Sequence, residues 1–267
     1  MDLLEVKSIG EVKSAYVTAG ALGVYSYITD GIIIDTGSQS ILKALIPFFD
    51  SNDYDQVLLT HYHEDHTGGC AWIQANKNVP IYIHPMSIDI CAKQGDYPDY
   101  RKQIWGVREG FEALPIEETF QSRNYSWEVI YTPGHSPDHV SFLNQSNGVL
   151  FSGDLFVTPK TKVILQEELI PSTMDSIEKV LQYEFQEVFC AHAGYMPNGK
   201  EMLRKKLDYL KNLEGEVFHL NSQGLSIEEI QQKLLPASYP IITVSDHEWD
   251  SKHMITSILG KQKYKFE

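Results

Sequence analysis

The segment from His61 to His66 reads His-Tyr-His-Glu-Asp-His and concentrates metal-binding residue types. Imidazole nitrogens and carboxylate oxygens are donors that zinc and similar divalent ions accept in proteins. Residues i and i+2 of an extended segment point to the same side, so His61 and His63 can converge on one ion. A turn that begins at Asp65 can direct Asp65 and His66 to a neighbouring position. The segment therefore predicts a metal site rather than a solvated polar loop.

Three further donors stand where other predicted strands end. They are His135 after residues 129–131, Asp154 after residues 150–152 and His192 after residues 188–190. Gly or Ala accompanies each donor, which leaves room for backbone close to a ligand. Seven donors exceed what one tetrahedral ion with an open position can use. We therefore predict two ions that share a carboxylate.

Together these motifs resemble those of the metallo-β-lactamase superfamily over roughly residues 14 to 200. The resemblance rests on the run 61–66, Thr-Pro-Gly-His at His135, Ser-Gly-Asp at Asp154, Ala-His-Ala-Gly at His192 and Ile-Ile-Asp-Thr-Gly at Asp35. It implies that His61, His63 and His135 hold a first ion. It also implies that Asp65, His66 and His192 hold a second, with Asp154 as the bridge.

The same resemblance implies an α/β fold, a four-layer αββα sandwich with the site along one edge of its two sheets. The expected cofactors are two divalent ions, Zn²⁺ by default, although Fe and Mn suit the same donors. Asp65 is the predicted catalytic residue, because it could orient a metal-bridging hydroxide and move its proton to the leaving group. Asp35 is expected behind a metal ligand, and His139 in a hydrogen-bonded packing role.

The aspartate at the bridging position narrows the function that the resemblance implies. Zinc β-lactamases typically lack it, whereas glyoxalase II-like hydrolases, lactonases and nucleases keep it. Residues 155–160 read Leu-Phe-Val-Thr-Pro-Lys and depart from the glutathione-contacting stretch of glyoxalase II. We predict a dinuclear hydrolase of a small thioester, ester or lactone. The alternatives are a nuclease of the same superfamily, a mononuclear iron persulfide dioxygenase and a metal-binding scaffold without activity.

The charge and composition of the chain restrict the kinds of molecule that it can bind. The 267 residues include 22 Lys plus Arg and 36 Asp plus Glu, for a formal net charge of −14. This sign disfavours a nucleic acid, and residues 211–267, with six Lys and eight acids, offer no basic stripe. We expect a small-molecule substrate, leave a homo-oligomer open and expect no membrane partner, because no run approaches 18 apolar residues. Three scattered cysteines and no visible secretory signal favour a cytoplasmic location.

The elements that must position the donors alternate between strands and helices. The pair Asp30-Gly31 favours a two-residue hairpin, and a helix is expected from about residue 40 to 49. Further strands are expected at 56–60, 79–83, 127–132, 139–143, 149–152 and 188–190. Residues 85–118 are expected to be a helical, irregular insertion whose aromatic side chains could line an apolar pocket.

The last part of the chain is expected to be mainly helical from about residue 200. Gly215 lies near the change of pattern, so we predict a catalytic domain over residues 1–214 and a C-terminal helical extension over residues 215–267. Two pairs with capping-box spacing, Ser172 with Asp175 and Ser226 with Glu229, predict helix starts.

Overall fold

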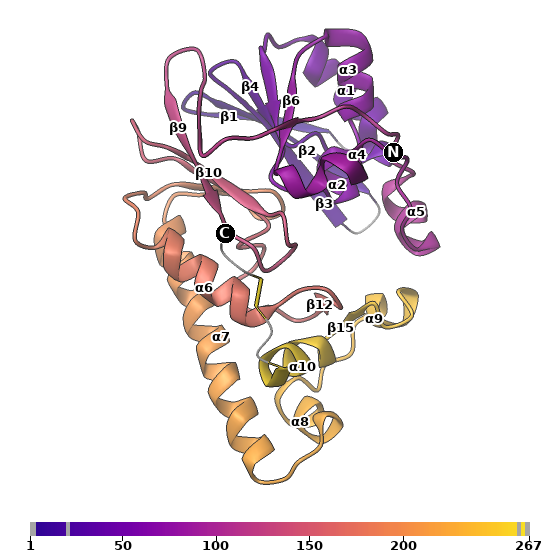
Figure 1. Ribbon diagram of the computed structural model, residues 1–267, viewed down its shortest axis with the longest axis vertical. Helices are drawn as coiled ribbons and strands as arrows, with labels where there is room; N and C mark the ends of the chain where they lie inside the picture. The colour runs from indigo at the N-terminus through magenta and orange to yellow at the C-terminus, as the bar shows by residue number, and fades with distance from the viewer. Residues whose placement is uncertain (1–3, 20–21, 261–262, 265–267) are drawn as a thin grey trace.

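A computed structural model describes residues 4–19, 22–260 and 263–264 of the chain and arranges most of its strands in two large sheets (Figure 1). The first sheet has the strand order β1-β2-β3-β4-β5-β6-β7. Its strands are β1 (Glu5–Ile9), β2 (Val12–Ala19), β3 (Leu22–Thr29), β4 (Ile32–Ile34), β5 (Gln56–Leu58), β6 (Ile81–Ile83) and β7 (Leu114–Pro115). Strands β1 to β4 pair in antiparallel fashion, and β4 to β7 pair in parallel.

The second sheet has the order β14-β13-β11-β10-β9-β8. Its strands are β8 (Thr119–Gln121), β9 (Ser126–Tyr131), β10 (Val140–Asn144), β11 (Leu150–Gly153), β13 (Val188–Cys190) and β14 (Gly194–Met196). Strands β11 and β13 are parallel. A separate ribbon joins β12 (Ile164–Leu165) to β15 (Trp249–Asp250), which lies more than 80 residues later in the chain.

Successive side chains of a strand point to opposite faces of its sheet, and this arrangement builds the predicted four layers. Ile32 and Ile34 of β4 pack with Phe151 of β11 in the core between the sheets, while Ile33 faces the helices that cover the first sheet. On β11, Leu150 faces the helices on the other side. Because both faces of these strands are buried, their sequences are continuously apolar rather than alternating.

Helices cover the outer face of each sheet (Figure 1). The first sheet is covered by α1 (Leu42–Asp50) and α3 (Cys70–Lys77), and the second by α6 (Ile170–Val180) and α7 (Gly199–Ser222). The short α2 (Glu64–Thr67) lies inside the predicted metal-binding run, and 3-10 turns occupy Gln39–Ile41 and Pro85–Ser87. This arrangement confirms the predicted αββα sandwich.

The predicted hairpin and insertion are found with one difference. Asp30 and Gly31 have φ values of 44° and 80° and connect β3 to β4, as the turn pair predicts. The insertion contains α4 (Ile88–Cys91) and α5 (Asp99–Trp105). Its last residues differ from the prediction, because they form β7 and extend the first sheet beside β6.

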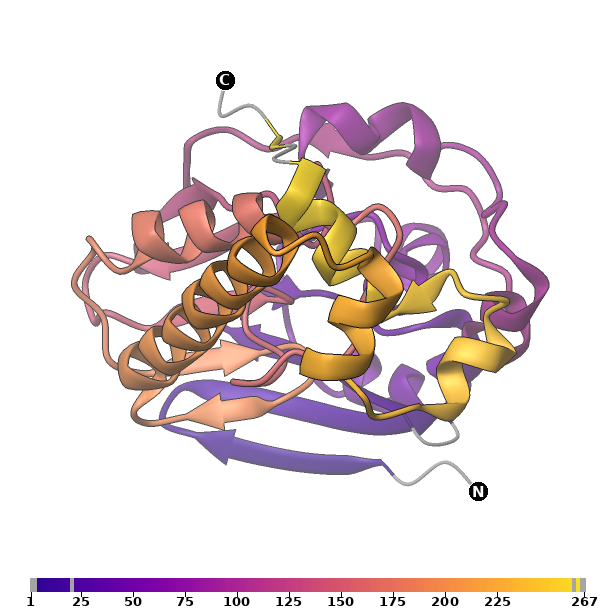
Figure 2. The same cartoon turned by 90° about the horizontal axis from the view of Figure 1, so that it is seen from below.

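The C-terminal segment packs against the second helical layer. It contains the second half of α7, then α8 (Ile227–Leu234), α9 (Pro240–Val244) and α10 (Lys252–Gly260). Helices α6, α7 and α10 lie below the second sheet in Figure 1 and in front of it in Figure 2, and their apolar residues share one core. Helix α7 is continuous through Gly215, so that glycine does not mark a break, and the division at residue 215 stays a prediction.

The two capping-box predictions have different outcomes. Ser226 accepts a hydrogen bond from the Glu229 amide and Glu229 accepts one from the Ser226 amide, so the predicted capping box starts α8. The prediction for Ser172 is wrong, because α6 begins at Ile170 and Ser172 lies inside it. Pro171 explains the earlier start, since proline suits the first helical turn, where its missing amide hydrogen is not needed.

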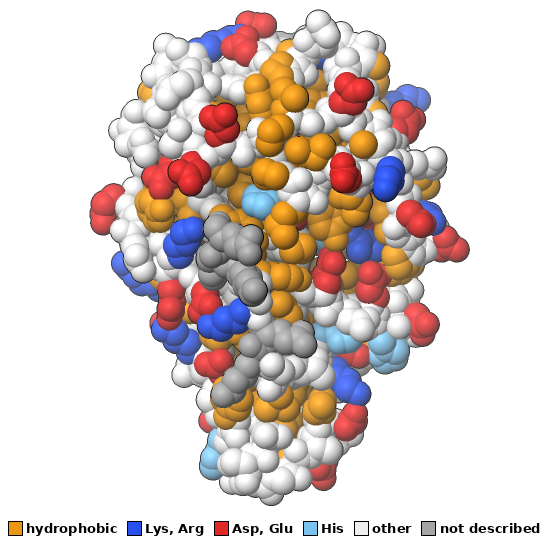
Figure 3. Space-filling model, in the orientation of Figure 1, with side chains coloured by type: hydrophobic (Ala, Val, Ile, Leu, Met, Phe, Trp, Pro, Cys, Tyr) orange, Lys and Arg blue, Asp and Glu red, His pale blue; other side chains and the backbone are white. Residues whose placement is uncertain are grey.

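No helix in the described ranges is long and apolar enough to cross a bilayer. On the face drawn in Figure 3, Lys and Arg side chains are interspersed with Asp and Glu rather than gathered into one basic patch.

Candidate metal centre

Three predicted donors converge from two sheet edges. His61 and His63 follow β5 of the first sheet, and His135 follows β9 of the second. His61 Nε2 lies 3.0 Å from His63 Nδ1, which lies 3.0 Å from His135 Nε2. All three residues are buried. We call His61, His63 and His135 the first trio.

The other four predicted donors form an adjoining group. His192 Nε2 lies 3.4 Å from Asp65 Oδ2 and 3.1 Å from Asp154 Oδ2, and His66 Nε2 lies 3.7 Å from Asp65 Oδ2. Asp65, His66 and His192 are the second trio. Asp154 touches both groups, since its Oδ2 is also 3.4 Å from His135 Nε2 and its Oδ1 is 3.6 Å from His66 Nε2. The structure thus brings all seven predicted donors together, with Asp154 between the two trios.

The side of each imidazole that faces away from the cluster is held by a fixed partner. Asp35, predicted behind a ligand, contacts His66 Nδ1 at 2.8 Å and accepts a hydrogen bond from the Thr60 hydroxyl at 2.8 Å. That hydroxyl oxygen is 3.0 Å from His61 Nδ1. The Gly23 carbonyl can only accept, so His192 Nδ1 donates to it at 2.8 Å. These contacts leave the inward nitrogens free to offer lone pairs.

Two further partners were missed by the sequence analysis. Glu167 Oε1 lies 3.0 Å from His63 Nε2, and Glu168 Oε2 lies 3.1 Å from His135 Nδ1. Both glutamates are in the turn between β12 and α6, where an adjacent pair of acids is typical of a solvated surface. Nothing in their spacing signals the contact, because the partner histidines lie about 30 and 100 residues earlier.

Unpaired buried atoms inside the cluster fit a bound cation. Within the described part of the chain, His66 Nε2 and Asp154 Oδ1 are buried and have no hydrogen-bond partner. Such atoms are costly unless another ligand satisfies them. Three donor sets have all their ligand atoms within 4.8 Å of one another: the first trio, the second trio, and His61 with His66 and Asp154. Imidazole and carboxylate donors at this density suit two divalent ions.

Residues 20–219 match the family model of the metallo-beta-lactamase superfamily. The chain belongs to this superfamily. It is 31% identical over 176 residues to the Beta-lactamase-like protein 2 homolog of Drosophila melanogaster, a match that covers 63% of this chain and 57% of that protein. It is 32% identical over 128 residues to the Thioesterase pkgB of Emericella nidulans, covering 46% of this chain and 32% of that protein. The chain therefore spans less than two thirds of the length of these relatives.

A solved structure of the same superfamily fold is TTHA1623 in a di-iron-bound form. The two share 25% identity with a TM-score of 0.56, over 70% of this chain and 96% of that one. The superfamily is metal-dependent, and its members include metallo-hydrolases and thioesterases.

Charge is distributed unequally between the first trio and the second trio. Burial lowers the pKa of His61 well below its usual range, and the neighbouring imidazoles of His66 and His63 lower it further. Burial would also lower the pKa of His66, but the carboxylates of Asp65, Asp35 and Asp154 outweigh it and raise that pKa well above the usual range. Negative charge is therefore concentrated around the second trio.

Asp154 is held in place by the residues around it. His139 Nε2 accepts a hydrogen bond from the Asp154 amide at 3.0 Å and its Nδ1 lies 2.9 Å from the Thr132 hydroxyl, which confirms the predicted packing role. The buried Lys206 donates to the carbonyls of Leu155 and Phe156 at 2.9 and 2.7 Å. Burial lowers the pKa of Lys206 to about 8.

The glycine before the central carboxylate has no space for a side chain. Gly153 has a φ of 49°, and a Cβ there would lie 2.6 Å from His139 Nε2 and 2.9 Å from Thr60 Cβ. We expect Gly153→Ala to lower the free energy of unfolding by roughly 2–3 kcal/mol. Gly215→Ala is the matched control, because it lies in α7 with nothing within 4 Å of an added Cβ. It should raise the free energy of unfolding by about 0.5–1 kcal/mol. Urea denaturation measures both, and a Gly153 variant as stable as wild type contradicts the argument.

Tyr195 does not lie where an oxyanion could use it. The residue stands three positions after His192 in the sequence. Its hydroxyl instead donates to Glu187 Oε1 at 2.6 Å. Adjacent strands β13 and β14 pair Tyr195 with Phe189, away from the cluster.

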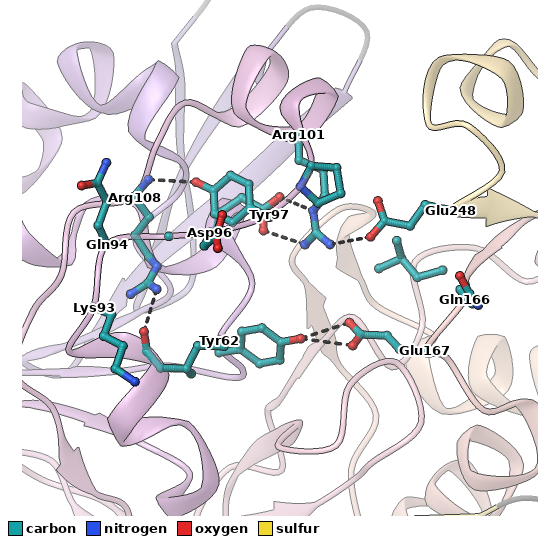
Figure 4. Close-up of a pocket in the computed structure, with 15 residues that line it drawn as sticks. Tyr62, Lys93, Gln94, Asp96, Tyr97, Arg101, Arg108, Gln166, Glu167 and Glu248 are labelled. Carbon is teal, nitrogen blue, oxygen red and sulfur yellow. Dashed lines mark hydrogen bonds and ion pairs between the residues drawn. The ribbon is translucent and has the colours of Figure 1, made fainter.

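A cavity of about 520 Å³ lies beside the centre (Figure 4). It is lined by the insertion, by the residue Tyr62 between two ligands, by Glu167 and by Glu248 of the C-terminal segment. The lining is mixed and charged rather than apolar, and Trp105 and Phe111 of the insertion belong to the core. Glu167 accepts from the Tyr62 hydroxyl at 3.1 Å and also contacts His63, so it connects the cavity wall to the first trio.

Proposed function

We propose that the protein is a dinuclear metal-dependent hydrolase that acts on a small thioester. The observation that carries this proposal is the arrangement of seven donors in two trios with Asp154 between them. A shared carboxylate fits two ions better than one. Zinc is the first choice, and the related di-iron structure makes iron the next.

The choice of a thioester rests on a relative and on chemistry. The Emericella nidulans relative is named a thioesterase, although the chain spans only 32% of its length. Two divalent ions in the trios would lower the pKa of water and polarise a carbonyl oxygen. Thioesters, esters and lactones all contain such a carbonyl. The chemistry therefore defines the type of reaction more closely than it defines the substrate.

Asp65 is the residue we assign to proton handling. Its side chain is 12% exposed, second among the seven donors to that of His192 at 19%, so a substrate can approach it. Burial raises its pKa, but His66 and His192 outweigh burial and hold the pKa well below its usual range. The carboxylate is therefore ionised at neutral pH, and its oxygens can orient water and accept a proton for the leaving thiolate.

A nucleic acid substrate is not favoured. The net charge of −14 repels a phosphate backbone. The interspersed charges in Figure 3 provide no basic track on that face. We therefore propose a small molecule as the partner.

Metal removal and reconstitution test the proposal. Protein stripped with a chelator should lose at least about 10²-fold of its thioesterase rate and recover it when two equivalents of Zn²⁺ or Fe²⁺ are restored. His61→Ala should remain inactive after reconstitution, whereas His219→Ala, an exposed residue of α7, should recover like wild type. The panel should include thioesters, lactones, phosphodiesters and a persulfide.

Other results would support the alternatives. Salt-sensitive cleavage of RNA without thioester turnover would indicate a nuclease. Oxygen consumption with a persulfide and one iron per chain would indicate a dioxygenase. Tightly bound metal without turnover of any panel member would indicate a scaffold.

A further inference from the structure

Two adjacent glutamates contact the outward nitrogens of the first trio. Glu167 reaches His63 Nε2 at 3.0 Å, and Glu168 reaches His135 Nδ1 at 3.1 Å. Neighbouring residues thus approach two different ligand histidines. We call Glu167 and Glu168 the glutamate pair.

The pair fixes which nitrogen of each histidine carries hydrogen. Glu167 Oε1 lies 3.0 Å from His63 Nε2, which is hydrogen-bonding distance. A carboxylate oxygen accepts this hydrogen bond, so His63 Nε2 carries the hydrogen and Nδ1 keeps its lone pair. Glu168 imposes the opposite tautomer on His135, with the hydrogen on Nδ1 and the lone pair on Nε2. The two nitrogens with free lone pairs lie 3.0 Å apart, and His63 Nδ1 is also 3.0 Å from His61 Nε2.

The pair also supplies charge that the first trio lacks. The first trio consists of three imidazoles, whereas the second trio includes Asp65 and has Asp35 behind His66. A divalent ion among neutral, buried donors is poorly compensated. Two carboxylates behind His63 and His135 reduce this imbalance and make the imidazoles stronger donors.

The turn that carries the pair is held by the C-terminal segment. Strand β12 precedes the turn and pairs with β15, and the Gln166 amide donates to the Glu248 carbonyl at 2.9 Å. The Tyr264 hydroxyl donates to the Glu167 carbonyl at 2.7 Å. Within the turn, Glu168 Oε1 accepts from the Leu165 amide at 2.8 Å. The C-terminal segment therefore contributes to the site without supplying a donor.

We propose that Glu167 and Glu168 are positioning residues that set the affinity of the first trio for its ion, and that the C-terminal segment holds them in place. This inference rests on the proposed function only in requiring that the chain bind metal. It assigns a role to the C-terminal segment, whose purpose the sequence left open. It also predicts that the two ions respond differently to the same substitution.

Metal affinity measured without turnover tests the pair. Zn²⁺ is titrated into metal-free protein against a chromophoric chelator, and Co²⁺ absorption reports the geometry of each ion. Glu167→Gln and Glu168→Gln should each lower the affinity for one of the two ions by about 10- to 100-fold and alter the Co²⁺ absorption spectrum of that site. The other ion should keep its affinity to within a few-fold. Glu117→Gln, on the exposed surface of the same chain, is the matched control.

The outcomes separate this inference from the proposed function. If the affinities for both ions fall equally, or if neither affinity differs from that of the Glu117 variant, the role of the glutamate pair is overturned. If wild-type protein binds two ions with the expected asymmetry in the variants but hydrolyses no thioester, only the proposed function fails. If wild type binds no ion, both fail. Near-UV circular dichroism of the metal-free variants identifies any that fail to fold, and Glu168→Asp then replaces the glutamine variant as a milder change.

Tyr264→Phe tests the contribution of the C-terminal segment. It removes the hydrogen bond to the Glu167 carbonyl and leaves both carboxylates intact. We expect the affinity for the ion that responds to the glutamate pair to fall by about two- to five-fold, in line with a partial loss of one supporting contact. An unchanged affinity would overturn the part of the inference that concerns the C-terminal segment and leave the glutamate pair unaffected.

Discussion

Asp154→Asn is expected to lower kcat/KM for a thioester by about 10³-fold, because it removes the carboxylate that, among the residues the structure describes, touches both trios. Asparagine has nearly the same size, so the backbone contacts to His139 and Lys206 should remain. The lost negative charge removes the largest of the interactions that raise the pKa of His192 and one of the three carboxylates that raise the pKa of His66. The measurements are steady-state kinetics and metal content of the reconstituted variant.

The metal content of the variant shows whether the loss of activity arises because Asp154 is shared by two ions. If Asp154 is shared, the variant should retain no more than about one tightly bound ion per chain. Asp208→Asn is the control, since Asp208 is exposed on α7 far from the donors in sequence. Two tightly bound ions together with wild-type activity in the Asp154 variant would show that the carboxylate is not shared.

The seven donors could be predicted because of where they stand relative to the strands. His61, Asp154 and His192 each follow a strand of a parallel pair, and the carboxyl ends of parallel strands meet at one edge. The short apolar strands before them are visible in the sequence as Val57-Leu58-Leu59, Leu150-Phe151-Ser152 and Val188-Phe189-Cys190. The local pattern thus carries the information that places the donors.

The glutamate pair could not be predicted, because its position depends on contacts distant in sequence. The turn that contains Glu167 and Glu168 is placed by β15, a two-residue strand that no periodicity reveals. Ser172 has a different, local reason, because the neighbouring Pro171 favours a helix start before the serine. Gly215 similarly suggested a boundary, but the apolar face of α7, including Leu213 and Val217, continues past it into the shared core.

A buried ion pair beside the donors leads to the largest expected effect on stability. Glu64 lies between the candidate donors His63 and Asp65, and its side chain is 3% exposed. Arg101 of the insertion binds it with both ends of its guanidinium, Nε to Oε1 and Nη2 to Oε2, each at 2.6 Å. Arg101 Nη1 also lies 3.4 Å from Glu248 Oε1. The pair therefore connects the metal-binding run to the insertion and to the C-terminal segment, as Figure 4 shows for Arg101 and Glu248.

Arg101→Ala should lower the free energy of unfolding by about 3 kcal/mol, because it leaves the Glu64 carboxylate buried without a partner. The value lies at the low end for such a loss, since Arg101 lines the cavity and water can enter when it is removed. Arg101→Lys should recover little, because an ammonium cannot make two parallel hydrogen bonds to one carboxylate. The double variant Arg101→Met with Glu64→Leu should recover most of the loss, since it removes both charges together.

Urea denaturation of metal-free wild type, Arg101→Met, Glu64→Leu and the double variant gives the coupling energy between the two residues. The exposed pair Lys205 and Glu201 on α7 provides the reference, where the loss on removing one partner should stay below about 1 kcal/mol. Equal effects at both pairs would show that Glu64 is solvated and that the insertion contributes little to stability. A large coupling confined to Arg101 and Glu64 would mean that the insertion stabilises the segment that carries His63 and Asp65. In that case, loss of the pair should weaken metal binding as well as folding, although neither residue is a donor.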